Sequence, residues 1–148
     1  MEIAEFLLAR FDEDEAVARA ATAGPWIARQ HDDGDVPSMW SVDGPIPPGG
    51  KYEATVVEVD YDRDYGSPQG GCDREANAAH IARHDPARVL AECEAKRRIV
   101  EAAEPVAGQY GPWGGIGDDD GWSAIEWALR CLALPYADHP DYRQEWRP

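Results

Sequence analysis

The clearest candidate metal ligands in this chain are two histidines, His80 and His84. They stand four positions apart in HIARH, and on a continuous helix that spacing points both imidazoles to one side. The zinc-protease motif also needs Glu directly after its first histidine, where this chain has Ile81. Because Asp85 and Pro86 follow at once, we expect the helix to break at His84 and to spoil the shared face. The alternative is a histidine that stabilises the C-terminal end of a helix.

A second pair of possible metal ligands, His139 and Asp141, lies in the segment DHPDY near the end of the sequence. A zinc site needs three or four protein ligands, and HIARH shows only two histidines. Convergence of the two segments would therefore complete a site for a divalent metal. The predicted ligands are His80, His84, Asp85, His139 and Asp141.

The charge balance excludes some classes of partner. The 148 residues include 29 acidic and 14 basic side chains, which gives a formal net charge of −15. Direct nucleic-acid binding needs clustered Lys and Arg, and anionic membrane also attracts basic surfaces, so neither is expected. The one basic cluster, Lys96 to Arg98, is too small to change this expectation.

The carboxylates cluster, and one cluster has the spacing that begins an EF-hand calcium loop. Asp60, Asp62 and Asp64 match the first three ligand positions of that loop. Tyr65 and Gly71 stand where the loop requires Gly and Glu, so the calcium template fails.

Clustered carboxylates can instead imitate phosphates and attract a cationic protein, although a run of charges is often only a solvated face. An exposed tryptophan in the glycine-rich loop would add an apolar anchor to such a surface. The predicted partner-binding residues are Asp60, Asp62, Asp64, Trp113, Asp118, Asp119 and Asp120.

The three cysteines, Cys72, Cys93 and Cys131, are widely spaced and form no CxxC pair. This pattern indicates reduced thiols rather than a disulfide framework, and Cys93 and Cys131 are expected on buried helix faces. No apolar run approaches the roughly 18 residues of a spanning helix, and the acidic N-terminus does not suit a signal peptide. We therefore expect a cytoplasmic protein.

The first half of the chain predicts a helix followed by strands. Apolar residues recur at helical spacing from Glu2 to Thr22, and Gly24 and Pro25 then stop the helix. Strands are expected at 26–31, 39–42 and 52–61, with a turn at 32–35, as an antiparallel meander. One face of the sheet would carry Trp26, Trp40 and some of Val56, Val57 and Val59.

The second half predicts helices. Asp73 caps a helix over 74–83, and Asp85 with Pro86 starts another that ends before Pro105. We expect its apolar stripe to be buried, with Glu94 and Arg98 paired on the solvent-exposed side. The stripe consists of Val89, Leu90, Cys93 and Val100.

The last helix has a clear N-terminal signature. Ser123 and Glu126 form a capping box, and Trp122 and Trp127 form a hydrophobic staple. The apolar face consists of Ile125, Ala128, Leu129 and Leu132.

These elements predict an α+β fold with an N-terminal helix, a three-stranded antiparallel meander and a helical C-terminal half. We expect a single domain over residues 1–148. Its parts are a helix (1–24), the β-meander (25–62), helices (73–134) and a packed tail (135–148).

Two motifs, HIARHDPARVL and ALPYADHPDYR, together resemble a family of small acidic proteins from actinobacteria and their phages. Ala23 to Trp26 and the helix from Asn77 to Ala82 also resemble a wider phage-associated group. The family is a domain of unknown function, so the resemblance implies no activity, cofactor or catalytic residue. It implies a small accessory protein of mobile-element or phage type.

The sequence carries no complete catalytic motif, which favours a non-enzymatic regulatory protein that binds a basic protein partner through its carboxylates. One alternative is a metal-dependent enzyme or metal-binding protein that uses the histidines. A second alternative is a small-ligand binder with aromatic side chains from the sheet and tail. The oligomeric state does not follow from the sequence.

Overall fold

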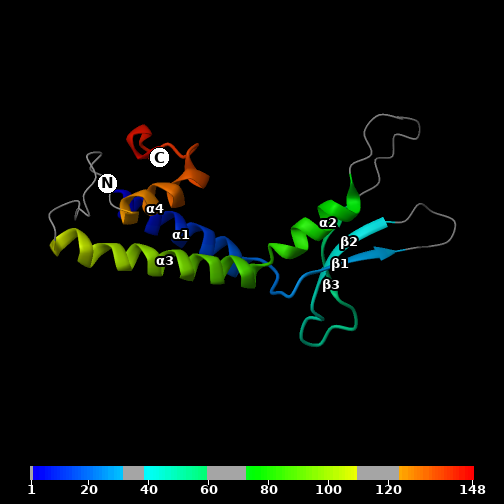
Figure 1. The fold of residues 1–148 in the computed structure, drawn as a ribbon. Helices are drawn as coiled ribbons and strands as arrows, with labels where there is room; N and C mark the ends of the chain where they lie inside the picture. Colours follow the sequence, from blue (N-terminus) through cyan, green and yellow to red (C-terminus); the bar gives the residue numbers. More distant parts are fainter. Residues whose placement is uncertain (1, 32–38, 60–72, 110–123) are drawn as a thin grey trace. The chain divides into compact units, whose positions relative to one another are not determined.

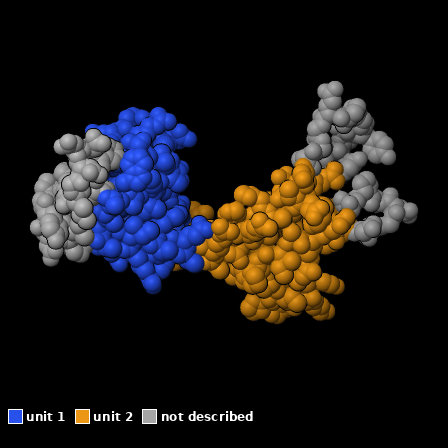
Figure 2. Space-filling model, in the orientation of Figure 1, with its two compact units in different colours: residues 1–16, 91–148 blue, residues 17–90 orange. Residues whose placement is uncertain are grey.

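The computed structural model describes residues 2–31, 39–59, 73–109 and 124–148, and among these it leaves out the side chains of Val59 and 104–109. It divides into two compact units, coloured separately in Figure 2. The helical unit comprises residues 1–16 and 91–148, and the sheet unit comprises residues 17–90. The boundaries between the units fall inside two helices, α1 and α3.

The sheet unit holds three strands in the order β1-β2-β3, namely β1 (Ile27–His31), β2 (Met39–Gly44) and β3 (Ala54–Val59). Both pairs are antiparallel, which confirms the predicted meander (Figure 1). The turn expected at 32–35 lies outside the described residues.

The register decides which side chains share a face. Val42 lies opposite Ala28 on one side and opposite Val57 on the other, so these three residues lie on the same face. An irregularity between Val42 and Asp43 leaves Val56 as an extra residue in β3. Trp26 was expected in the first strand but precedes it, and its Nε1 donates a hydrogen bond of 2.8 Å to the carbonyl oxygen of Thr22.

Helix α2 (Arg74–Arg83) packs on this sheet (Figure 1). Ala78 in the helix and Val42 in the central strand are both fully buried. Asp73 caps α2 as predicted, because its carboxylate accepts a 2.9 Å hydrogen bond from the backbone N–H of Ala76. The chain then turns through His84 and Asp85 into α3 (Pro86–Gln109), where Asp85 Oδ1 accepts from the N–H of Arg88 at 2.9 Å.

The helical unit contains most of α1 (Ile3–Ala20), the larger part of α3, and α4 (Ala124–Ala133). Two short 3₁₀ turns, Leu134–Tyr136 and Gln144–Trp146, shape the tail. The largest fully buried side chains of the described part of this unit are Phe6, Leu7, Phe11, Cys93 and Val100.

Phe6 joins the tail to α1. Its ring centroid lies 5.0 Å from that of Trp146, 6.4 Å from Tyr136 and 6.1 Å from Tyr142. Edge-to-face contacts of this kind stabilise beyond the area that they bury. Residues far apart in the sequence thus form one aromatic core.

One helix prediction was wrong, and another falls outside the described residues. Helix α3 continues through Pro105 to Gln109, where the sequence was expected to end it. A proline inside a helix costs about 3 kcal/mol, and the high helix propensity of Ala102 and Ala103 offsets part of that cost. Ser123 and Trp122, the expected cap and staple of α4, lie outside the described residues, while Trp127 is 50% exposed.

The buried faces of α3 and α4 match their predictions in part. Cys93 and Val100 are buried as expected, whereas Val89 and Leu90 are only partly buried. In α4 the buried residues are Glu126, Leu129 and Ala133, while Ile125, Ala128 and Leu132 are intermediate. Cys131 is exposed, so its expected burial was wrong.

The fold is α+β, as predicted: a helix, a three-stranded antiparallel sheet, and then helices. Within the described ranges, no helix combines the length and apolar character needed to cross a membrane.

Candidate functional site

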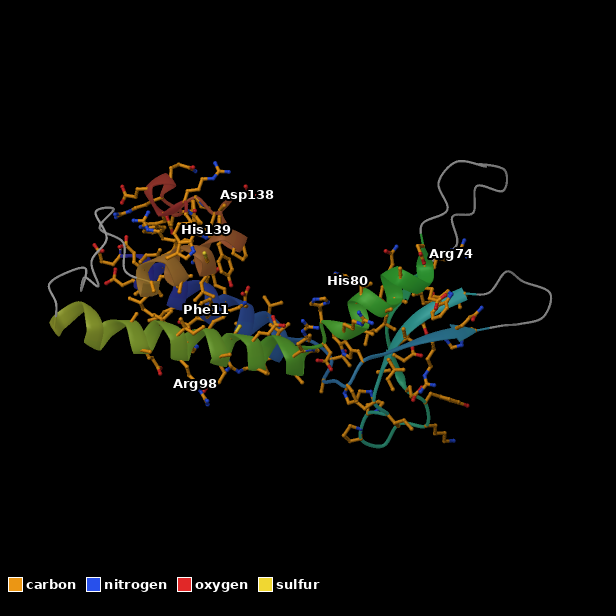
Figure 3. All side chains as sticks on the ribbon, viewed as in Figure 1. Phe11, Arg74, His80, Arg98, Asp138 and His139 are labelled. Carbon is orange, nitrogen blue, oxygen red and sulfur yellow. The ribbon has the colours of Figure 1, made fainter. Side chains whose placement is uncertain are left out.

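The structure brings His80 and His84 together at the C-terminal end of α2. Helix α2 ends at Arg83, as the break at His84 predicts, yet the two imidazole centroids are only 4.4 Å apart. The expected loss of the shared face was therefore wrong. The backbone N–H of His84 still donates to the carbonyl oxygen of Ile81 at 3.0 Å, which keeps this residue over the last turn. Figure 3 labels His80 at this end of the helix.

The tautomer of His84 follows from its hydrogen bond. Its Nδ1 lies 2.8 Å from the backbone carbonyl oxygen of His80, and a carbonyl can only accept. Nδ1 therefore carries the proton, and in the neutral ring Nε2 keeps its lone pair. Both histidines are exposed.

Asp85, the third predicted ligand of this segment, is engaged elsewhere. Its Oδ1 caps α3 at the N–H of Arg88. A Cβ placed on Gly24 would lie 2.5 Å from its Oδ2, so the chain needs glycine at that close approach.

His139 and Asp141 lie together in the helical unit, but their hydrogen bonds differ from those of the first pair. Nδ1 of His139 accepts from the backbone N–H of Asp141 at 3.1 Å, and Nη1 of Arg10 lies 2.7 Å from Nδ1 and 2.5 Å from Nε2. The bond from Asp141 occupies Nδ1, and the Arg10 guanidinium covers both ring nitrogens. Arg10 is itself buried, and its Nη2 pairs with Glu13 at 2.7 Å.

The five predicted metal ligands are therefore divided between the two units, three in the sheet unit and two in the helical unit. Over the ranges that the structure describes, no three His, Cys, Asp or Glu side chains form a group able to hold a metal ion.

The acidic run on α1 forms internal ion pairs within the helical unit. Arg97 of α3 pairs through Nη2 with Asp12 at 2.5 Å and through Nε with Glu15 at 2.8 Å. The hydrogen bond that Arg97 donates to Glu15 is the main cause that raises the pKa of Arg97 above its ordinary value. These pairs thus hold α1 to α3; the Glu15 side chain is 12% exposed, while Asp12 remains 72% exposed.

Asp14, in the same run, binds the tail. The hydroxyl of Tyr136 donates to Asp14 Oδ2 at 2.5 Å. Burial, followed by this hydrogen bond, raises the pKa of Tyr136 far above its ordinary value. Burial also raises the pKa of Cys93, with Asp14 adding to the effect, so this thiol stays protonated and unreactive.

The sheet unit carries a polar cluster that sequence reasoning missed. Ser41 and Asp43 are buried neighbours on one face of β2, and the Ser41 hydroxyl donates to Asp43 Oδ2 at 3.0 Å. His31 Nε2 lies 2.8 Å from the same hydroxyl oxygen. Nε of Arg29 lies 3.6 Å from Asp43 Oδ2, and its Nη2 lies 2.6 Å from Glu53.

This serine, histidine and aspartate do not have the order of a catalytic triad. In a triad the serine gives its proton to histidine, and aspartate holds the other ring nitrogen. Here the proton of Ser41 goes to Asp43, so His31 acts as a donor to the hydroxyl. The cluster satisfies a buried carboxylate and does not prepare a nucleophile.

Helix α4 turns its charged pair inward. Glu126 and Arg130 pair at 2.5 Å, and their side chains are only 8% and 16% exposed. Arg130 Nη1 also lies 2.5 Å from the carbonyl oxygen of Glu145, which ties the helix to the tail. The outward side of α4 presents Trp127 and Cys131 at i, i+4 spacing, and the 3₁₀ turn that follows presents the exposed Leu134.

The predicted partner-binding residues Asp60, Asp62, Asp64, Trp113, Asp118, Asp119 and Asp120 all lie outside the described residues.

These features define an α+β protein with a histidine pair, an internal polar cluster and an acidic sequence. The whole chain, residues 1–148, matches a family of unknown function (DUF6221), and the chain belongs to that family. No curated protein is significantly similar to it. No solved structure is significantly similar either.

Proposed function

We propose that this protein is a non-enzymatic interaction protein that binds a basic protein partner. The observation that carries the proposal is the excess of 29 acidic over 14 basic residues. Several arginines are paired with carboxylates of the same unit, among them Arg10, Arg97 and Arg130. Each pair cancels one charge of each sign, so the net charge of −15 remains on other side chains. A field of this sign speeds encounter with a cationic surface.

The outward side of α4 also supports the proposal. Trp127 is 50% exposed and Leu134 is 41% exposed, and no charged residue of α4 stands at the positions between them on that side. Partly exposed tryptophan is a frequent anchor of protein interfaces. We assign this side to the same basic partner, since a second copy of the chain would bring two charges of −15 together.

The test uses a synthetic amphipathic helix of lysine and leucine as the probe, with anisotropy recorded across a salt series. Neutralising Asp60, Asp62 and Asp64 to Asn, or Asp118, Asp119 and Asp120 to Asn, should each weaken binding by about tenfold at low salt. A matched control neutralises three exposed carboxylates elsewhere, Glu2, Glu75 and Glu101, to Gln.

The matched control separates a defined surface from charge alone. Binding that falls equally in all three triple variants would show a response to net charge and would overturn the assignment of the two clusters. Binding that is unchanged in every variant, or absent from the parent protein at low salt, would overturn the proposal itself.

The assignment of α4 has its own arm of the test. Trp127→Ala should weaken binding of the probe by about tenfold, and Tyr52→Ala, at an 82% exposed residue of the sheet unit, should leave it unchanged. Equal effects of the two substitutions would exclude α4 from the interface. A dimeric mass by sedimentation that Trp127→Ala converts to monomer would make a second copy the occupant.

A further inference from the structure

We infer that His80 and His84 form an exchangeable site for one borderline divalent transition-metal ion, with Cu²⁺ preferred over Ni²⁺ and Zn²⁺. The site is independent of the proposed partner binding. It uses two protein ligands from one helix end, and water completes the coordination of the ion.

The first argument is the distance between the rings. Two nitrogens bound at about 2.0–2.1 Å from one ion are no more than about 4 Å apart. The imidazole centroids of His80 and His84 are 4.4 Å apart, inclined at 45°. This separation allows a nitrogen of each ring to reach a shared ion once the exposed His80 side chain rotates.

The second argument is the hydrogen bond that orients His84. Histidine ligands commonly donate their second ring N–H to a carboxylate or a backbone carbonyl, which fixes the tautomer and strengthens the ligating nitrogen. Here Nδ1 of His84 is held at 2.8 Å from the carbonyl oxygen of His80, so Nε2 is the ligating atom. The protein thus supplies the second-ring contact that metal sites use, without any ion bound.

The third argument is the position at the end of α2. The last carbonyl groups of a helix carry a partial negative charge that favours a cation. The guanidinium of Arg88 also lies there, 3.3 Å from the carbonyl oxygen of Arg83, and its charge opposes a second cation. The site therefore binds more weakly than a closed structural zinc site and exchanges its ion readily.

The ligand chemistry sets the class of ion. Neutral imidazole suits Cu²⁺, Ni²⁺ and Zn²⁺, whose affinities for nitrogen sites peak at Cu²⁺. Mg²⁺ and Ca²⁺ need several oxygen ligands, and Asp85, the nearest carboxylate in sequence, already caps α3. Protons compete for imidazole, so binding weakens as the solution is acidified.

The test is calorimetric titration of the full, untagged chain with Cu²⁺, Ni²⁺, Zn²⁺ and Mg²⁺. The parent protein should bind one ion of each of the first three, and no Mg²⁺. Because a chelate loses most of its affinity with either ligand, His80→Ala and His84→Ala should each weaken Cu²⁺ binding by about 10- to 100-fold.

The chain offers close controls, because it has four histidines. His31→Ala should leave Cu²⁺ binding unchanged, and Cys131→Ser separates binding by the exposed thiol from binding by imidazole. Ala76 is exposed and lies one turn before His80, so Ala76→His in the His84→Ala background should rebuild an i, i+4 pair and restore binding.

Restored binding in the Ala76→His, His84→Ala double variant would show that lost binding in His84→Ala comes from the missing ligand and not from misfolding. Cu²⁺ affinity that is unchanged in both single variants, or abolished by Cys131→Ser alone, would overturn the site. So would a parent protein that binds no Cu²⁺. Failure of these experiments would leave partner binding through carboxylates unaffected, because that proposal uses no histidine.

Discussion

In the helical unit, Nδ1 of His139 accepts a hydrogen bond from the backbone N–H of Asp141, Arg10 Nη1 contacts both ring nitrogens, and the side chain is 28% exposed. In the sheet unit, His80 and His84 are exposed, and the bond from His84 Nδ1 leaves its Nε2 lone pair available. The same residue type is thus a structural acceptor in one unit and a candidate ligand in the other. Hydrogen bonds decide which role a histidine has, and sequence spacing does not reveal them.

The largest effect is expected from removing the aromatic centre of the helical unit. Phe6→Ala deletes a fully buried ring that contacts Tyr136, Tyr142 and Trp146, so it should lower the free energy of unfolding by about 3–5 kcal/mol. Denaturant unfolding measures the loss. Val17→Ala, at a residue that is 72% exposed, should change it by no more than about 0.5 kcal/mol. Similar losses in both variants would show that the tail does not pack on Phe6.

The inward pair of α4 should be the next most sensitive. Arg130→Met leaves the Glu126 carboxylate buried without its cation, which should cost about 3 kcal/mol. Replacing both residues, with Glu126→Leu added, should recover most of that loss. Arg98→Ala removes an exposed pair of the same i, i+4 spacing and should cost no more than about 0.5 kcal/mol. Thermal unfolding of the three variants compares them, and equal costs for Arg130→Met and Arg98→Ala would contradict the inward orientation.

The polar cluster of the sheet unit should show a smaller cost. Ser41→Ala removes the hydrogen bond that the buried Asp43 carboxylate accepts, so it should lower the free energy of unfolding by about 1–3 kcal/mol. Hydrogen exchange should locate the loss in β1 and β2. Asp43→Asn combined with Ser41→Ala should cost less than the two single losses added, because the partners are removed together. Strict additivity would mean that the two side chains do not interact.

The smallest effect concerns Tyr136 and depends on pH. The folded protein holds the pKa of Tyr136 above its ordinary value, so its proton is bound more tightly in the folded state than in the unfolded state. The stabilisation is therefore fully present below about pH 10 and is lost as the pH rises further. Tyr136→Phe should cost about 1 kcal/mol at neutral pH and should flatten this alkaline loss. Unfolding at neutral pH and above about pH 10 measures both, and an unchanged alkaline slope would contradict the burial of the Tyr136 hydroxyl against Asp14.

Local signals predicted the fold well. The caps Asp73 and Asp85, the helix boundaries at 74 and 83, and the three strands all follow from short stretches of sequence, where capping and alternation act over a few residues. The expected end of α3 before Pro105 was wrong, because the prediction gave the proline more weight than the helix propensity of the alanines around it.

The site depended on contacts between distant residues, which local patterns do not encode. The spacing of His80 and His84 could be read from the sequence, but the bond that keeps both rings together could not. Nothing near Asp12 or Glu15 indicates that Arg97, some 80 positions away, would bind them. Alternation in β2 places Ser41 and Asp43 on one face, and that signal could have revealed the polar cluster.

The most direct test of the contrast between the units is NMR of the four imidazole rings during a Zn²⁺ titration. The account predicts that the Nε2 resonance of His84 and the ring of His80 shift together, while His31 and His139 stay unchanged and His84 keeps its Nδ1 proton. A shift at His139 without one at His84, or no shift in any ring at excess Zn²⁺, would contradict it.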